Sequence, residues 1–136
     1  MKTIDIQQLN TKRNPIMVYY DNLNHSKFSN EYLFVKQKDK YQKIKITDIN
    51  VIHADNNCTM LHFKNNTKIL CNKPLAEWVT ELDKNYFIRI HRSIVVNMHE
   101  IDFIDLTKGM IIIQEMNLRI GRSFREDLNQ VFKFII

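Results

Sequence analysis

The amino-acid sequence predicts a mainly β protein with about ten short, mostly antiparallel strands and two helices. Short stretches rich in β-branched and aromatic residues follow one another closely, and polar turns separate them. Turns this close favour hairpins over βαβ units. Apolar residues recur at helical spacing in only two stretches, one near the middle of the chain and one at its end.

The composition is that of a single folded domain. The chain has 136 residues, and with only two glycines and two prolines it has no composition suited to a long flexible linker. Lysine and arginine number 20 against 15 acidic residues, a formal net charge of +5. This balance permits binding to a polyanion without establishing it.

Cysteine usage and hydropathy predict a cytoplasmic protein. Cys58 and Cys71 lie in apolar contexts without CxxC spacing, so we expect reduced packing residues. The sequence has no signal-peptide pattern and no apolar run near the ~18 residues of a membrane span. We therefore expect no membrane partner.

Residues 1–29 are predicted to be an extension or linker before a domain that covers residues 30–136. A short strand at residues 16–20 could follow Pro15, but the surrounding residues are polar and typical of turns. From residue 31 the pattern becomes that of strands, which we place at residues 32–35, 43–46, 49–54, 58–63 and 67–71. Turns are expected at 36–40, 55–57 and 64–66.

The first helix is expected after Asn72, a plausible N-cap, with Pro74 in the first turn and an end near residues 83–85. Its apolar face combines Leu75, Trp78, Val79 and Leu82. Strands are then predicted at 87–90, 94–97, 101–106, 110–115 and 118–120.

The last helix carries a capping-box signature, with Ser123 at the N-cap and Glu126 three residues later. One face of this helix would present the apolar residues Leu128, Val131, Phe132 and Ile135.

The stretch 87–97, FIRIHRSIVVN, places a polar group between two apolar runs. Packed strands on both sides would hold the tips of Arg89, His91, Arg92 and Ser93 in fixed positions. Arginine offers a planar donor fork suited to phosphate or guanine, and serine and histidine can donate to phosphate oxygens or base edges. The stretch therefore has the chemistry of a nucleic-acid contact.

This stretch, the following MHEI at 98–101 and LRIGRSF at 118–124 together resemble the LytTR (LytR/AgrA-type) DNA-binding domain of bacterial transcription regulators. The resemblance covers roughly residues 31–134, and the family pattern F-x-R-x-H-R-S-x-x-V-N is met throughout. It implies an elongated arrangement of small sheets and sequence-specific binding of double-stranded promoter DNA. Members usually occupy paired repeat sites, so a homodimer on DNA is expected.

In the family a linker at the N-terminal position leads from a signal-receiving domain. Fewer than thirty residues cannot hold a phosphoacceptor receiver. Either the regulator stands alone and takes its signal from a separate partner, or the sequence is a fragment of a longer protein.

The resemblance also implies which residues contact DNA. His91 and Arg92 would lie near bases or phosphates, Arg89 would contact the backbone, and Ser93 would bind a phosphate or cap the turn. Arg122 and Ser123 occupy a second DNA-contacting corner, where Gly121 replaces the serine common in the family. Asn57 and Thr59 belong to a third loop, and their side chains can bind adenine edges or phosphates.

Two other functions remain open from the sequence. One is a protein-interaction module that kept the fold and lost DNA binding. The other is a small RNA-binding or RNA-cleaving protein, which would need exposed aromatic rings. The alternation of the strands directs most aromatic residues inward, which argues against it.

An enzyme is not expected. The histidines lack HxH or HExxH spacing, and the sequence has no metal-binding carboxylate pair and no glycine-rich phosphate loop. We predict no metal and no cofactor.

Overall fold

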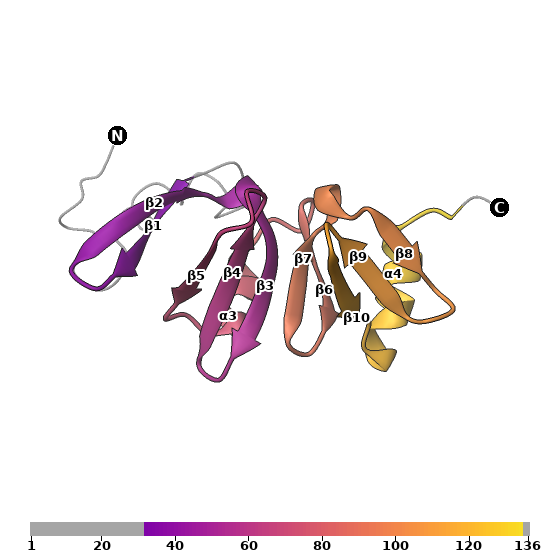
Figure 1. Cartoon of the computed structure of the whole chain (residues 1–136). Helices are drawn as coiled ribbons and strands as arrows, with labels where there is room; N and C mark the ends of the chain where they lie inside the picture. The colour runs from indigo at the N-terminus through magenta and orange to yellow at the C-terminus, as the bar shows by residue number, and fades with distance from the viewer. Residues whose placement is uncertain (1–31, 135–136) are drawn as a thin grey trace.

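The computed structural model describes residues 32–134, which form a row of three antiparallel sheets with two α-helices (Figure 1). A two-stranded hairpin pairs β1 (Tyr32–Gln37) with β2 (Lys40–Lys45). The central sheet has the strand order β5-β4-β3-β7-β6, and the third sheet the order β10-β9-β8. The predicted mainly β class, with ten strands in small sheets and two helices, is confirmed.

The remaining elements follow the chain in order. The central sheet is built from β3 (Ile49–Asp55), β4 (Cys58–Phe63), β5 (Lys68–Cys71), β6 (Phe87–His91) and β7 (Ile94–Asn97). The third sheet contains β8 (Phe103–Asp105), β9 (Met110–Ile113) and β10 (Met116–Arg119). The two α-helices are α3 (Leu75–Glu81) and α4 (Arg125–Val131). Three short 3-10 turns complete the fold: η2 (Ile46–Asp48), η3 (Met98–Glu100) and η4 (Arg122–Phe124).

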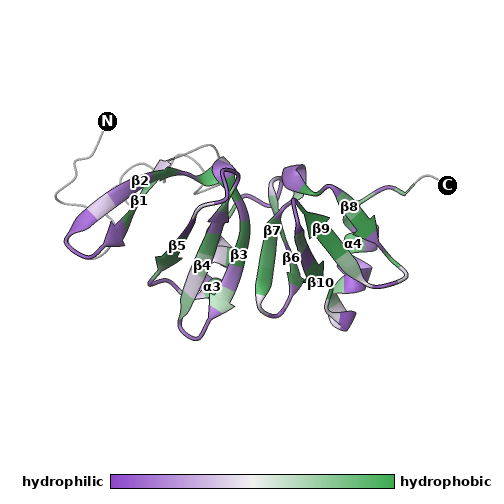
Figure 2. Cartoon of the chain, in the orientation of Figure 1, coloured by the Kyte–Doolittle hydropathy of each residue, from purple (hydrophilic) through white to green (hydrophobic). Residues whose placement is uncertain are grey.

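The central sheet is covered on both faces along β7 and the buried part of β3, which separates two cores, whereas β5 leaves Lys68 and Leu70 exposed on one face. Ile52 and Val95 face the first core with the hairpin and α3, whereas Val51 and Val96 face the second core with the third sheet and Leu128 of α4. All four residues of β7 are buried, so its unbroken apolar sequence reflects two covered faces. Figure 2 shows β7 mostly green and the turns mainly purple, whereas strand β2 of the hairpin is largely hydrophilic.

Helix α3 is tied to the central sheet through Trp78, which is 1% exposed. The indole Nε1–H donates to Thr59 Oγ1 at 2.9 Å, and the same hydroxyl donates to the Lys73 carbonyl at 2.9 Å. Thr59 is fully buried in this network. Its expected contact with DNA is therefore wrong for this structure, because β-strand alternation turns the side chain inward.

Both predicted helix caps are wrong. Pro74 is the N-cap of α3 and makes no side-chain cap bond, while Asn72 Oδ1 instead accepts from Cys58 Sγ at 3.7 Å. Helix α4 starts at Arg125 without a side-chain cap, and Ser123 lies inside η4. The Phe124 N–H donates to the Gly121 carbonyl at 2.9 Å, and this 3-10 turn takes the place of the expected capping box.

Several strand boundaries differ from the prediction. The first hairpin has a tighter turn than the expected 36–40, because β1 continues to Gln37 and β2 begins at Lys40, and β10 begins already at Met116.

Two further differences arise from local turns. The Asn97 side chain accepts from the His99 N–H at 3.0 Å and caps η3, so β8 begins only at Phe103. Gln114 has φ 55°, and the chain reverses there, which ends β9 at Ile113.

Several apolar side chains point outward where the sequence predicts burial. Val131 is 52% exposed, although Leu128 of the same helix is buried. Aromatic residues also depart from the predicted inward alternation, because five of them are exposed: Tyr32, Phe34, Tyr41, Phe103 and Phe134. The predicted strand at residues 16–20 and the predicted helix residue Ile135 lie outside the described residues.

Replacing Thr59 by valine should lower the free energy of unfolding by about 1–3 kcal/mol, because the buried Trp78 N–H loses its acceptor. Urea unfolding measures this loss. Thr59→Ser is the matched control, since it keeps the hydroxyl and should be less destabilised. Equal stability of the valine variant and the wild type would contradict the structural role.

The two cysteines should differ in reactivity. Both are free thiols, and burial raises the pKa of Cys71 to about 11. Because the thiolate is the reactive form, Cys71 should resist iodoacetamide near neutral pH while half-buried Cys58 is alkylated first. Mass spectrometry of a time course would show the order, and both should react in urea.

Candidate nucleic-acid interface

All five arginines of residues 32–134 lie in two short stretches, 89–92 and 119–125. The fold brings these stretches together, because the Gly121 N–H donates to the Ile90 carbonyl at 2.7 Å. This bond joins the corner between β10 and α4 to the end of β6. We call the resulting group the arginine cluster; it comprises Arg89, Arg92, Arg119, Arg122 and Arg125.

Arg89 shapes the turn between β6 and β7. Its Nε donates to the His91 carbonyl at 3.2 Å, and its Nη2 donates to the Arg92 carbonyl. The register of β6 against β7 shifts between Arg89 and His91, so this turn contains an irregularity that the guanidinium bridges. The exposed Arg92 side chain is therefore carried by a turn with a defined shape.

His91 is held in one orientation by Ser93. The Ser93 N–H can only donate, and it lies 3.1 Å from His91 Nδ1, while the Ser93 hydroxyl lies 2.9 Å from the same nitrogen. Nδ1 therefore acts as an acceptor, which places the ring proton of the neutral imidazole on Nε2. The histidine thus has Nε2–H as its remaining donor.

The turn between β3 and β4 lies beside the turn between β6 and β7. The Ala54 N–H donates to the Ser93 carbonyl at 2.8 Å, and Asn57 is exposed at the tip. Asn56 makes the reversal possible with φ 60°, a conformation that asparagine tolerates. Both turns and the start of α4 lie along the lower edge of the molecule in Figure 1.

Gly121 leaves room for the ring of Phe124. A Cβ at this position would lie 3.0 Å from a Phe124 ring carbon and 3.5 Å from His91 Cα. The Arg89 guanidinium carbon in turn lies 5.9 Å from the centre of the Phe124 ring. A serine here would require the Phe124 ring, which lies beside Arg89, to shift by a few tenths of an ångström.

The arginine cluster is not neutralised within the described part of the chain. No arginine there has a carboxylate within ion-pair distance, since the ion pairs found involve Lys64 and Lys73. Burial lowers the pKa of His91, and the positive charge of Arg92 lowers it further, with smaller effects from His53, Arg119 and Arg89. The imidazole is therefore neutral at pH 7 in a strongly positive surrounding.

Sequence reasoning missed Arg119 and His53 as neighbours of this site. Arg119, Arg122 and Arg125 line one depression with His91, and a second depression is lined by Arg92, Ser123 and Phe124 along with the shared His91, Gly121 and Arg122. The three-residue spacing of these arginines was the signal that could have found them.

The predicted site residues are therefore brought to one edge with a single exception. Arg89, His91, Arg92, Ser93, Arg122 and Ser123 meet around the bond from Gly121 to Ile90, and Asn57 projects from the neighbouring turn. Thr59 is the exception, because it is buried.

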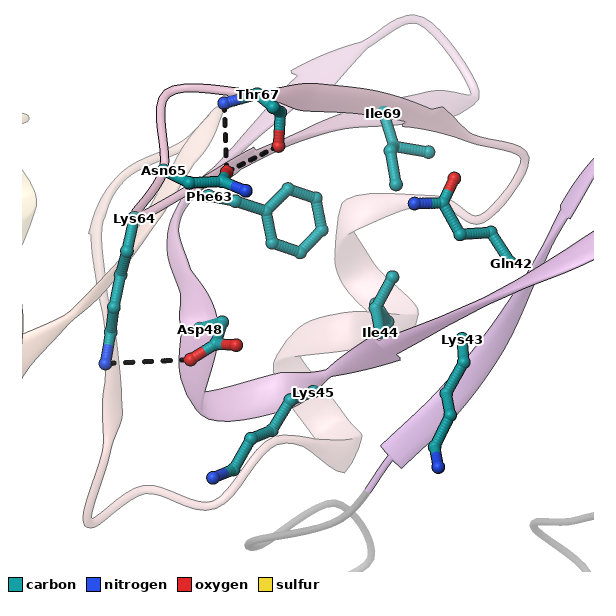
Figure 3. Close-up of a pocket in the computed structure, with 10 residues that line it drawn as sticks. All are labelled: Gln42, Lys43, Ile44, Lys45, Asp48, Phe63, Lys64, Asn65, Thr67 and Ile69. Carbon is teal, nitrogen blue, oxygen red and sulfur yellow. Dashed lines mark hydrogen bonds and ion pairs between the residues drawn. The ribbon is translucent and has the colours of Figure 1, made fainter.

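A second basic region lies where the hairpin meets the central sheet. It differs from the arginine cluster because one of its positive charges is paired with carboxylates. A pocket of about 270 Å³ there is lined by Lys43, Lys45 and Lys64 around Ile44 and Phe63 (Figure 3). Lys64 Nζ lies 3.8 Å from Asp48 and 3.3 Å from Glu100, so its charge is compensated. No acidic side chain of the range 32–134 compensates the arginine cluster in this way.

Among residues 32–134, no group of three or more His, Cys, Asp or Glu side chains is placed to hold a metal ion. None of the helices in this range is long and apolar enough to cross a membrane.

Comparison with known proteins agrees with this geometry. The family model of the LytTr DNA-binding domain matches residues 39–133. The transcriptional regulatory protein LytR of Staphylococcus aureus (strain N315) is 32% identical over 97 residues, which cover 68% of this chain and 39% of LytR. An uncharacterized response regulatory protein of Vibrio cholerae is 30% identical over 99 residues, or 71% of this chain and 33% of that protein.

A solved structure described as the LytTr DNA-binding domain of a response regulator from Bacillus cereus has the same fold. It superimposes with a TM-score of 0.66 at 20% identity and covers 76% of this chain and 97% of that one. The present chain spans less than half the length of the curated relatives it matches. With the family model matching more than half of its residues, the chain belongs to the LytTR DNA-binding domain family.

Proposed function

We propose that this protein binds double-stranded promoter DNA in a sequence-specific manner and so regulates transcription. The observation that carries the proposal is the arginine cluster, in which side chains from two distant stretches meet at one edge without an acidic partner in the described residues. When an arginine has no carboxylate partner, no anion of the protein competes with a phosphate for its guanidinium group. The names of the relatives support the same function.

In this mechanism loops enter the DNA grooves rather than a recognition helix. Arg92 is exposed on a shaped turn, where its fork can bind guanine O6 and N7, and Asn57 can bind adenine in the same way. Arg122 and Ser123 are exposed at the second corner, where they are assigned to phosphates that set the register. Ser93 orients His91, whose Nε2–H is the donor offered to DNA.

Arg89 is assigned a positioning role in place of the backbone contact expected from the sequence. Two of its donors are bound to carbonyls of the turn that carries Arg92. Its removal would therefore act on DNA through the shape of the turn.

Assembly and signalling are further parts of the proposal. Paired binding of two copies on repeat sites would double the length of DNA that is read, and a separate signalling partner would control it. Family membership supports paired binding, the separate signalling partner is a further proposal, and the regulated genes depend on the operator sequence.

Selection of random duplex DNA on the purified protein tests the proposed function. Wild-type protein should enrich a defined motif, and Arg92→Ala should lose about 1–3 kcal/mol of binding free energy and relax one position of that motif. Salt must be held constant, since phosphate contacts make the affinity salt-dependent. Lys84→Ala, an exposed charge on the loop before β6, is the matched control and should enrich the wild-type motif.

Absence of any enriched motif in the wild type would contradict sequence-specific binding. An equal loss of DNA-binding free energy in Arg92→Ala and Lys84→Ala would show that only the total charge of the protein matters. Arg92 would then have no role in reading a base.

Duplex binding should strengthen as the pH falls through the titration of His91. In the free protein its pKa lies below the ordinary value of about 6.5, and a phosphate beside the ring would raise it. Between these two pKa values the complex holds more protons than the free protein, so acidification favours the complex. Fluorescence anisotropy across this pH window measures the effect.

His91→Gln should remove this pH dependence, whereas His62→Gln should keep it. Burial and Lys68 also lower the pKa of His62, but this histidine lies on β4 away from the arginine cluster. A lowered pKa in the folded state also makes acid unfold the free protein more easily, because the unfolded chain takes up protons first. Circular dichroism must therefore confirm folding at each pH.

A further inference from the structure

The outward face of the hairpin formed by β1 and β2 has a regular composition. Every pair of opposed residues on this face combines one aromatic ring with one lysine: Tyr32 with Lys45, Phe34 with Lys43, and Tyr41 with Lys36. All six side chains are exposed, and neither strand contains an acidic residue. We call this surface the hairpin face.

The hairpin face does not contribute to the core. The opposite side of the same hairpin provides Leu33, Val35 and Ile44 to the first core, and these residues are only 5–6% exposed. On the outside, Tyr32 is 47%, Phe34 37% and Tyr41 63% exposed. The apolar residues of the inner side attach the hairpin to the sheet. The exposed rings are therefore not needed for that attachment.

The chemistry of the hairpin face suits one kind of ligand. Exposed rings on a sheet are stacking platforms for nucleic-acid bases, and lysines beside them pair with phosphates. The rings can stack only on bases that are not already stacked within a duplex. An alternation of ring and ammonium group therefore matches the alternation of base and phosphate along a single strand.

We propose that the hairpin face binds single-stranded nucleic acid, DNA or RNA, without strong sequence preference. An acidic peptide would pair with the lysines but would leave the three rings without a partner. Duplex DNA would do the same, because its bases present only their edges in the grooves.

Lys43 already lies over a ring of this face. Its Nζ is 4.4 Å from the centre of the Tyr32 ring, a cation–π contact between diagonal neighbours. The ammonium group therefore covers one face of the Tyr32 ring, so a base would stack on the other face or on Phe34 and Tyr41, and Lys43 would pair with a phosphate of the same strand. The contact orders the side chain before a ligand binds.

This site is separate from the arginine cluster and does not depend on the proposed duplex function. The hairpin lies at one end of the row of sheets, while the arginine cluster spans the central and third sheets (Figure 1). Each surface can therefore be tested by variants that leave the other unchanged.

The test measures fluorescence anisotropy of the full chain with labelled oligothymidylate, labelled oligouridylate and a labelled duplex, at one stated salt concentration. The double variant Phe34→Ala/Tyr41→Ala should weaken binding of both single strands by about tenfold or more and keep the wild-type duplex affinity. Phe103→Ala is the matched control, since this ring is 69% exposed on the third sheet and should not contribute. Thermal unfolding must show that the double variant keeps the wild-type midpoint.

Several outcomes would overturn the inference. One is the absence of single-strand binding by the wild type. Another is a loss of single-strand affinity in Phe103→Ala as large as that in the hairpin variant. A third is a loss of single-strand affinity in Arg92→Ala while the hairpin variant keeps the wild-type affinity. Polyglutamate that binds as tightly as the oligonucleotides would also overturn it, because the face would then act through charge alone. Single-strand binding that depends on the hairpin face would support the inference even if duplex selection enriched no motif.

Discussion

Burial of β7 on both of its faces is the constraint on which the rest of the structure depends. With β7 covered on both sides and Val95 and Val96 facing different cores, a slip by one residue would exchange the two faces. The register of β6 and β7 is therefore strongly specified. A fixed register of β6 and β7 also fixes the position of the turn that joins them. The polar side chains of His91, Arg92 and Ser93 are therefore held on a rigid support.

The interface joins features that are distant in the sequence through a few main-chain bonds. The Gly121 bond to Ile90 places one group of arginines beside the other, and the Ala54 bond to Ser93 adds the turn that carries Asn57. Several positive charges gathered without carboxylates repel one another and reduce folding stability. Burial lowers the pKa of His91, and the neighbouring positive charges lower it further. Phosphates would relieve the repulsion, so the same arrangement that costs stability favours a polyanion.

Errors in the sequence-based predictions share a physical cause. Thr59, Asn72 and Ser123 are small polar residues that suit turns, caps and DNA contacts equally well, and local pattern does not distinguish these uses. Trp78 decides the position of Thr59 by its need for a buried acceptor. The packing of Phe124 against Gly121 accompanies the 3-10 turn that displaces Ser123 from the cap position. The exposed rings of the hairpin were missed because the alternation of residues along a strand separates two faces but does not tell which face a core covers.

The sequence by itself determined the strand content, the two helices, the family and the FIRIHRSIVVN stretch, because alternation, helical spacing and a specific motif are local properties. Only the tertiary structure decided that the two arginine stretches meet, that Thr59 is buried and that rings and lysines oppose each other on the hairpin. These facts depend on the register and on contacts between distant residues, and a local pattern does not specify either.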